Sequence, residues 1–471
     1  MKLEKNIIII LLLSIIFSCT KHEKVNDFIG FWEGPHPEDI TKKFYIQFIY
    51  HNNEIAANGF WTKNGFYDSE FMVDSIKITA DSVRFYVPIW NCNYTGQLYA
   101  DTSIRGGFQC EGELFDPVRL TKNEEVSIYL TQAKPDCTSE NYQYFYDRPV
   151  VINDNIPVSG YQSAQDSLFI YSIIPEIIHG DYGRINSFLL LKDGKLICEE
   201  YFYGYTHTDL HQIESSTKSI TSLLIGIAKD QAYITSIYEP LYKIFPHYRH
   251  LESDEYSKIS IYHLLNMTSG YDTENDAVFH AENRIDYAIK REMAHQPGDT
   301  FVYDGGNTEI LGAVIKSKTG MYADEFAERY LFTPLNIKSY NWDILKQDGF
   351  PCMGGSLKLR PRDMAKIGLM VLNKGKFENQ QIVSQQWIEE STSIKIKTHI
   401  EGDNYGYHWW NIDLHSNGFS YNTIWANGLG SQFIYIIPEL NVVIVTTGFN
   451  YGHDSWAITD GIGKYIYLLD N

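Results

Sequence analysis

The chain has 471 residues, of which 44% are hydrophobic and 21% charged, a balance typical of folded globular proteins and unlike that of disordered or fibrous ones. At this length, two domains are expected. The formal net charge of −20 opposes binding to nucleic-acid phosphates or to anionic lipid headgroups, so neither is expected as a partner.

The N-terminal residues have the pattern of a targeting segment. Lys2 and Lys5 precede an apolar run, Ile7 to Phe17, that is too short to span a hydrocarbon core of roughly 30 Å. The run continues into Ser18-Cys19. This ending resembles the lipobox of bacterial lipoproteins, which implies a signal peptide over residues 1–19 and lipidation of Cys19. An ordinary secretory signal cleaved nearby is the alternative. Both predict export, and the first predicts a protein of the periplasm or cell surface of a bacterium, held at the membrane by its lipid alone.

The other five cysteines form no CxxC pair, so neither a zinc site nor a complete disulfide framework is predicted. Cys92 and Cys110 lie in one β-rich segment. They either bridge neighbouring strands in an oxidising compartment or remain buried thiols. The remaining three are Cys137, Cys198 and Cys352.

Residues 25–130 are predicted to form a small all-β barrel or sandwich domain. Short alternating runs, such as those at 44–50 and 83–87, are bounded by Asn, Gly or Asp turns. Nothing in this region suggests catalysis, and a spacer or binding role is expected. Residues 131–160 contain Pro and Asn and have little periodicity, which indicates a linker.

A second domain is predicted over residues 161–471. Apolar runs on both sides of Asp193-Gly194 indicate a hairpin, because this pair suits a type I′ turn. Ile220, Leu223, Leu224 and Ile227 have the spacing of a buried helical stripe. Further helices are expected at 308–319, 361–375 and 456–469, and strands at 433–437 and 442–446. This order predicts an α+β fold in which helices pack on an antiparallel sheet.

A candidate nucleophile stands at the start of the first of these helices. Ser215 and Lys218 are three residues apart and share a helical face. A serine hydroxyl is a weak nucleophile, and a desolvated lysine can act as its base. The helix N-terminus adds a partial positive charge near a developing oxyanion. The spacing is common by chance, so the alternative is a solvated helix start in which Ser215 only caps.

The sequence around this pair resembles the serine β-lactamase-like family, which includes class C β-lactamases, penicillin-binding proteins, D-aminopeptidases, related esterases and 6-aminohexanoate-dimer hydrolases. The resemblance runs from about Pro149 to the C-terminus. It implies a β-lactamase/transpeptidase-like fold and an acyl-enzyme on Ser215. The segments that carry it are Ser215 to Lys218, the HLLNMTSG segment at 263–270, and Gly354-Gly355-Ser356 with the PRDMA segment at 361–365.

The family's second motif is Tyr-x-Asn or Tyr-x-Ser, whose tyrosine relays a proton. The resemblance assigns this tyrosine to Tyr303, within Tyr303-Asp304-Gly305, so Gly305 departs from the motif. Asn307 is a candidate for the missing amide. Its alternative role is that of N-cap of the 308–319 helix.

The family's third motif, Lys-Thr-Gly or His-x-Gly, lends an oxyanion N–H and a cation. Neither form is present. The corresponding stretch contains Asn427, Gly428 and Leu429, which can offer a backbone N–H without the cation. Because the cation would pair with a substrate carboxylate such as that of β-lactam antibiotics, its loss favours esters or amides that lack one.

Other catalytic signatures are missing from the sequence. It has no His-Glu-x-x-His pair, Gly-x-Ser-x-Gly elbow or Gly-x-x-x-x-Gly-Lys loop. We therefore predict a cofactor-free serine hydrolase of the cell envelope, an esterase or a peptidase/amidase, acting on a small-molecule or peptide substrate. No oligomeric state is predicted. Two rivals stand beside it: a peptidase for D-amino-acid-containing cell-wall peptides, and a catalytically weak or inactive cell-envelope binding protein on the same fold.

Overall fold

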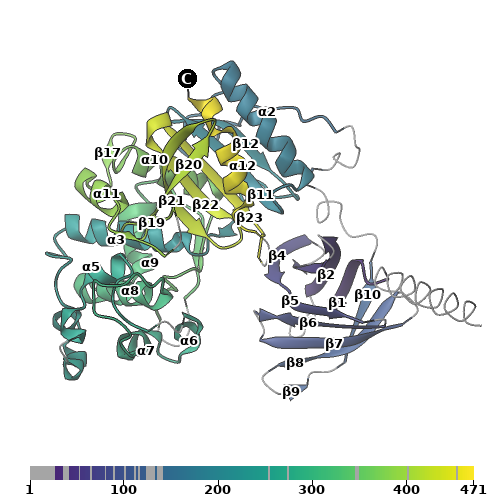
Figure 1. Cartoon of the computed structure of the whole chain (residues 1–471), viewed down its shortest axis with the longest axis horizontal. Helices are drawn as coiled ribbons and strands as arrows, with labels where there is room; N and C mark the ends of the chain where they lie inside the picture. The colour runs from purple at the N-terminus through teal and green to yellow at the C-terminus, as the bar shows by residue number, and fades with distance from the viewer. Residues whose placement is uncertain are drawn as a thin grey trace, which may run out of the picture. The chain divides into compact units, whose positions relative to one another are not determined.

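The computed structural model describes residues 27–35, 42–51, 54–63, 66–79, 81–88, 91–99, 102–110, 113–114, 117–123, 133–134, 142–252, 255–272, 275–344, 349–399, 402–451 and 454–470. The predicted signal segment with Cys19 lies outside these residues, as does Cys137. The chain divides into two compact units, residues 1–130 and 131–471 (Figure 1). None of the described helices has the length and apolar character needed to cross a membrane.

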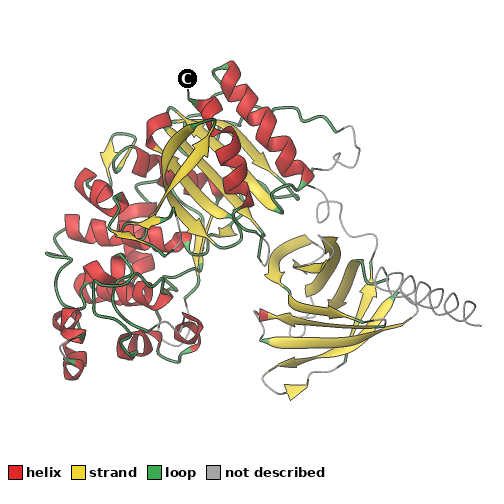
Figure 2. Ribbon diagram, in the orientation of Figure 1, coloured by secondary structure: helices red, strands yellow, loops and turns green. Residues whose placement is uncertain are grey.

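The first unit is a single antiparallel sheet of ten strands, which curls on itself like a barrel (Figure 2). The strand order is β4-β3-β2-β1-β10-β8-β7-β6-β5, and β9 pairs with β8. Alternate side chains, among them those of Trp32, Phe44, Phe85 and Tyr94, point inward and are fully buried. The all-β prediction is confirmed. The strands are β1 Gly30–Pro35, β2 Lys42–His51, β3 Glu54–Lys63, β4 Phe66–Met72, β5 Asp74–Ile78, β6 Ser82–Val87, β7 Cys92–Tyr99, β8 Ser103–Cys110, β9 Glu113–Leu114 and β10 Val118–Lys122.

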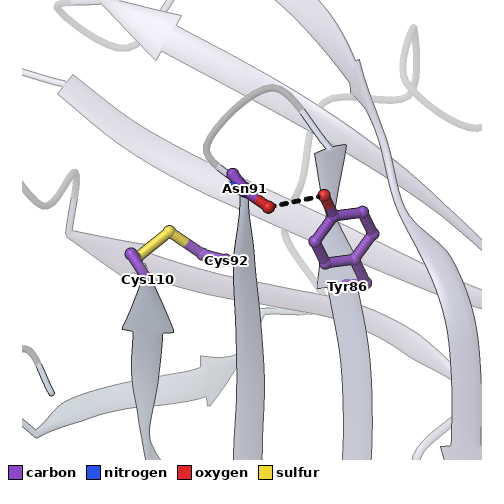
Figure 3. The surroundings of a disulfide bond; sticks show 4 residues. All are labelled: Tyr86, Asn91, Cys92 and Cys110. Carbon is purple, nitrogen blue, oxygen red and sulfur yellow. Dashed lines mark hydrogen bonds between the residues drawn. A yellow bond between two sulfur atoms is a disulfide. The ribbon is translucent and has the colours of Figure 1, made fainter. Parts of the chain in front are cut away.

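A disulfide joins two neighbouring strands of this sheet. Cys92 begins β7 and Cys110 ends β8, and the two residues are directly paired in the ladder with Cα atoms 4.2 Å apart. Beside them, Tyr86 Oη donates a hydrogen bond to Asn91 Oδ1 at 2.9 Å (Figure 3). Of the two possibilities left open by the sequence for this pair, the structure has the bridge.

The second unit is built on an eight-stranded antiparallel sheet with the order β12-β11-β23-β22-β21-β20-β19-β18. The hairpin predicted at Asp193-Gly194 joins β11 to β12, and both turn residues have positive φ. The strands of this sheet are β11 Ile185–Lys192, β12 Lys195–Tyr201, β18 Ile396–Lys397, β19 Asn404–Tyr405, β20 Trp410–Ser416, β21 Phe419–Gly428, β22 Gln432–Ile437 and β23 Val442–Gly448. Smaller sheets contain β13 His211–Gln212, β14 Tyr340–Trp342 and β15 Leu357–Leu359, and β16 Lys376–Phe377 and β17 Gln380–Gln381.

Helices cover both faces of the large sheet. Leu189 and Leu191 of β11 belong to one apolar cluster with α3, α8 and α10, whereas Phe188 and Leu190 belong to another with α2 and α12. The α+β prediction of an antiparallel sheet packed by helices is thus confirmed. The helices are α2 Ala164–His179, α3 Ser216–Asp230, α4 Leu241–Ile244, α5 Ile261–Leu265, α6 Asn275–His280, α7 Arg284–Lys290, α8 Gly305–Thr319, α9 Ala323–Ala327, α10 Pro361–Leu372, α11 Gln385–Thr392 and α12 Ala457–Tyr465, with short turns η3 Pro246–Leu251, η4 Tyr256–Lys258, η5 Glu328–Phe332, η6 Pro438–Leu440 and η7 Ile466–Leu469.

Several described residues of the segment 131–160, which belongs to the second unit, contact the rest of that unit. Tyr144 Oη donates to Glu200 Oε1 at 2.6 Å, and Val158 forms a parallel bridge with Leu196. The backbone carbonyl of Val150 accepts a hydrogen bond from the Arg362 guanidinium at 2.6 Å. Although this stretch has little periodicity, these contacts attach it to the sheet and to α10.

Candidate active site

The start of α3 presents the hydroxyl of Ser215. Ser215 is the N-cap residue, but its φ of −61° and ψ of −12° are helical and its side chain makes no capping hydrogen bond. The hydroxyl oxygen instead accepts from Lys218 Nζ at 2.9 Å. The alternative of a capping serine beside a solvated lysine is therefore wrong.

The Lys218 side chain is enclosed, with 5% of its surface exposed. Its amine also donates to the backbone carbonyl of Gly354 at 2.8 Å and lies 5.0 Å from the centre of the Tyr303 ring. Among the described residues, Lys218 forms no ion pair. The amine is thus oriented by a hydroxyl, a carbonyl and an aromatic face.

Tyr303 lies just before α8 in an aromatic group. Its ring meets that of Tyr405 edge-on at 6.2 Å and lies 5.5 Å from that of Trp410. The next residue, Asp304, caps α8 by accepting from the backbone N–H groups of Gly306 and Asn307. The buried guanidinium of Arg291 binds both Asp304 carboxylate oxygens, at 2.8 and 2.7 Å. The backbone that carries Tyr303 is therefore fixed on its C-terminal side.

The structure explains why glycine stands where the second motif has Asn or Ser. A Cβ at Gly305 would lie 2.7 Å from the Phe279 ring, so there is no room for a side chain.

Asn307 does not take either of its expected roles. Asp304, not Asn307, is the N-cap of α8, because the helix begins earlier than expected, at Gly305. The Asn307 amide accepts from Ser269 Oγ at 2.8 Å and directs its Nδ2 to Met267 Sδ at 3.6 Å. It makes no hydrogen bond with Ser215, Lys218 or Tyr303 among the described residues. Asn307 therefore joins α8 to the 263–270 segment.

The stretch that corresponds to the third motif lies next to the start of α3. Gly428 ends β21 and pairs with Gln432, whose carbonyl accepts from Ser216 Oγ at 2.8 Å. A Cβ at Gly428 would lie 2.3 Å from the Ile213 carbonyl oxygen, so only glycine allows this approach. Asn427 is partly exposed, and the Leu429 side chain is 54% exposed. The end of β21 thus lies next to the segment that leads into α3.

A carboxylate that the sequence analysis did not single out precedes the nucleophile. Glu214 has a φ of 48°, in the left-handed region, and its Oε1 accepts from Gln212 Nε2 at 2.8 Å and from Tyr451 Oη at 3.0 Å. Burial raises the pKa of Glu214 to about 7, against the effect of these two donors. The one signal in the sequence was its place beside Ser215. The positive φ, which is uncommon for a non-glycine residue and found at constrained sites, is visible only in the structure.

His408 connects three segments around the site. Its Nδ1 lies 3.1 Å from the Lys218 carbonyl and its Nε2 lies 3.2 Å from that of Leu264, while its own carbonyl accepts from Ser219 Oγ at 2.6 Å. Burial lowers the pKa of His408 to about 3. The His408 ring therefore lies between a carbonyl of α3 and a carbonyl of α5.

Within the described residues, no group of three or more His, Cys, Asp or Glu side chains is arranged to hold a metal ion. The fold and the Ser215–Lys218 pair define the class of serine hydrolases. The chain belongs to the beta-lactamase family, whose model matches residues 186–451.

Individual relatives agree with this assignment. The 6-aminohexanoate-dimer hydrolase of Paenarthrobacter ureafaciens is 23% identical over 290 residues, which cover 55% of this chain and 71% of the relative. A putative 6-aminohexanoate-dimer hydrolase from Bacillus anthracis has a similar fold, with a TM-score of 0.53 and 20% identity over 63% of this chain and 81% of its own. EstCE1, described as a hydrolase with promiscuous acyltransferase activity, has a TM-score of 0.55 and 14% identity over 65% of this chain and all of its own.

Proposed function

We propose that the protein cleaves an ester or amide through an acyl-enzyme on Ser215. The observation that carries this proposal is the 2.9 Å separation between Lys218 Nζ and Ser215 Oγ, in a buried setting at a helix N-terminus. A base within hydrogen-bond reach of a serine hydroxyl is the arrangement that activates the serine as a nucleophile.

In the proposed reaction, Lys218 in its neutral form accepts the Ser215 proton as Oγ bonds to the substrate carbonyl carbon. Backbone N–H groups at the start of α3 and in the turn after β21 hold the oxyanion. The leaving alcohol or amine departs with a proton relayed through Lys218 or Tyr303. Water then attacks the acyl carbon, and Ser215 regains its proton as the acid leaves.

The charges around Ser215 bear on the substrate. The stretch in place of the third motif, with Asn427, Gly428 and Leu429, has no cation, while the Glu214 carboxyl precedes the nucleophile. A substrate carboxylate would meet no fixed cation of the third-motif kind. This balance favours esters or amides with a neutral acyl group over β-lactam antibiotics.

We also propose that the protein acts outside the cytoplasm as a lipoprotein anchored through Cys19. The Cys92–Cys110 bridge supports export, because structural disulfides persist in oxidising compartments. The test is lipid labelling in a bacterial host: wild type should incorporate a radiolabelled fatty acid and Cys19→Ala should not. Equal labelling of both would reject the anchor.

The proposed activity is tested on the chain from Thr20 onward with a fluorophosphonate probe and a chromogenic short-chain ester. Ser215→Ala should lose both labelling and turnover. Ser222→Ala is the matched control, because Ser222 lies on the same helix, is fully buried and has a hydroxyl without a hydrogen-bond partner among the described residues. It should behave like wild type. A folded wild type that neither labels nor turns over would favour the rival reading as a binding protein.

A further inference from the structure

The Lys218 amine depends on one backbone carbonyl for its orientation. Within the part of the chain that the structure describes, the amine reaches one acceptor besides Ser215 Oγ, which is the Gly354 oxygen at 2.8 Å. The family's second-motif amide is absent, since Gly305 has no side chain and the Asn307 amide binds Ser269 and Met267. The carbonyl of Gly354 is therefore the group that keeps the Lys218 amine directed at Ser215.

The other side of this residue is held by a buried carboxylate. Gly354 N donates to Glu309 Oε1 at 3.0 Å, and the neighbouring Cys352 Sγ lies 3.6 Å from the same oxygen. Glu309 is on α8, which is far from α3 in the sequence but packs against it, since the two helices share one apolar cluster. Its side chain is fully buried.

An arginine fixes this carboxylate in turn. Arg284 Nη1 donates to Glu309 Oε2 at 2.7 Å, with both side chains at most 1% exposed. The second terminal nitrogen, Nη2, donates to the Phe350 carbonyl at 2.7 Å. Arg284 and Glu309 thus bind the 350–354 segment at two points, Phe350 and Gly354, and attach it to α7 and α8.

We propose that Glu309, held by Arg284, is a positioning residue for the reaction: it orients the Gly354 peptide so that its carbonyl keeps the Lys218 amine on Ser215. The proposal rests on the proposed function of Ser215. Neither Glu309 nor Arg284 touches the reacting atoms. For this positioning role, Glu309 must supply an acceptor oxygen to Gly354 N. The contribution of the Arg284–Glu309 ion pair to stability is a separate role and can be tested separately.

Two double variants isolate that acceptor. Arg284→Met with Glu309→Gln and Arg284→Met with Glu309→Met both remove the ion pair, and replacement of a whole buried pair by uncharged groups is often tolerated by the fold. Only the glutamine retains an oxygen for Gly354 N. The measurement is the rate of fluorophosphonate labelling of the chain from Thr20 onward, with thermal unfolding alongside.

The glutamine variant should label within about 3-fold of wild type, and the methionine variant roughly 10- to 100-fold more slowly, because small displacements of a catalytic group are costly. Equal labelling rates in the two variants would overturn the proposal.

Glu199→Gln is the control for loss of a buried carboxylate elsewhere, because Glu199 pairs with Arg362 at 2.5 Å under α10. This substitution should lower the melting temperature and leave the labelling rate unchanged. If the double methionine variant does not fold, the single variants Glu309→Gln and Glu309→Leu provide the same contrast. If the wild type is not labelled, the proposed function itself is wrong. If labelling occurs but does not depend on Glu309, only the positioning role is wrong.

Discussion

Lys218 Nζ lies 5.0 Å from the centre of the Tyr303 ring while it donates to Ser215 Oγ at 2.9 Å. One amine therefore faces both the hydroxyl that must lose a proton and the tyrosine that resembles the family's relay. The three groups come from separate segments, since α3 carries the serine and lysine and the residues before α8 carry the tyrosine. The packing of α3 on α8 is what brings them together.

Replacement of Lys218 by methionine should separate activity from stability. Loss of the base is expected to slow labelling of Ser215 by about 10²- to 10⁴-fold. The melting temperature should stay equal or rise, because Lys218 is buried without an ion pair among the described residues and its charge is costly to desolvate. Labelling rates and thermal unfolding test both parts. Rapid labelling of this variant would exclude Lys218 as the base.

Tyr303→Phe should lower ester turnover by about 10²-fold or more while leaving KM within a few-fold, because the ring keeps its packing on Trp410 and only the relay hydroxyl is lost. Steady-state kinetics give the split. Tyr407→Phe is the control, since the Tyr407 hydroxyl donates to Glu390 at 3.1 Å and makes no contact with Ser215 or Lys218 among the described residues. An unchanged kcat in Tyr303→Phe would remove the tyrosine from the mechanism.

Gly428→Ala should reduce labelling of Ser215 by roughly 10-fold or more. The added Cβ would lie 2.3 Å from the Ile213 carbonyl oxygen, so the turn after β21 must move away from the start of α3. Gly463→Ala serves as the comparison, because a Cβ there has its nearest neighbours at 3.9 Å and the helix α12 favours alanine. If Gly428→Ala labels as fast as Gly463→Ala, the turn does not contribute to the site.

Glu214 should make the protein less stable as the pH rises from about 5 to 8. Burial raises the pKa of Glu214 from 4.5 to about 7, so between these values the folded chain binds more protons than the unfolded one. Stability then falls with rising pH through this window. As the pH rises towards 8, the melting temperature of wild type should fall relative to that of Glu214→Gln, until the two are equal or the variant melts higher. The exposed Glu439→Gln should follow wild type throughout. Parallel curves for Glu214→Gln would contradict the raised pKa.

Removal of the disulfide by Cys92→Ser with Cys110→Ser should loosen the first unit and spare catalysis. A bridge that closes a loop of this length is worth about 3 kcal/mol. Hydrogen exchange followed by mass spectrometry should show faster exchange in β7 and β8, with unchanged labelling of Ser215 in the second unit. Slower labelling would reveal a dependence of the site on the first unit.

Much of the fold could be predicted from the sequence because its signals are local. The Asp193-Gly194 turn, the helical stripe from Ile220 to Ile227 and the alternating runs of the first unit each depend on residues close in the chain. The start of α8 was predicted too late in the chain, also for a local reason. Asp304 is an N-cap residue, but Gly305 and Gly306 follow it, and the low helix propensity of glycine did not indicate a helix there.

The candidate site was predictable only in part. Ser215 and Lys218 share one helix, so their spacing carried the prediction. The roles of Gly354 and Glu309 could not be read in this way, because they arise from contacts between residues far apart in the sequence. Nor could the sequence reveal that Phe279 fills the space beside Gly305.

The position of β23 in the sheet also governs when the site can exist during synthesis. This late strand lies between β11 and β22, with Thr446 opposite Phe188 on one side and Phe433 on the other. Until β23 has left the ribosome, β11 has no hydrogen-bonded neighbour along one edge, and its apolar side chains have no complete sheet to pack in. A nascent chain that already contains Ser215, Lys218 and Tyr303 therefore still lacks the middle of the scaffold that holds them. Folding of the hydrolase unit must therefore wait for β23, and a chain cut before this strand would be inert.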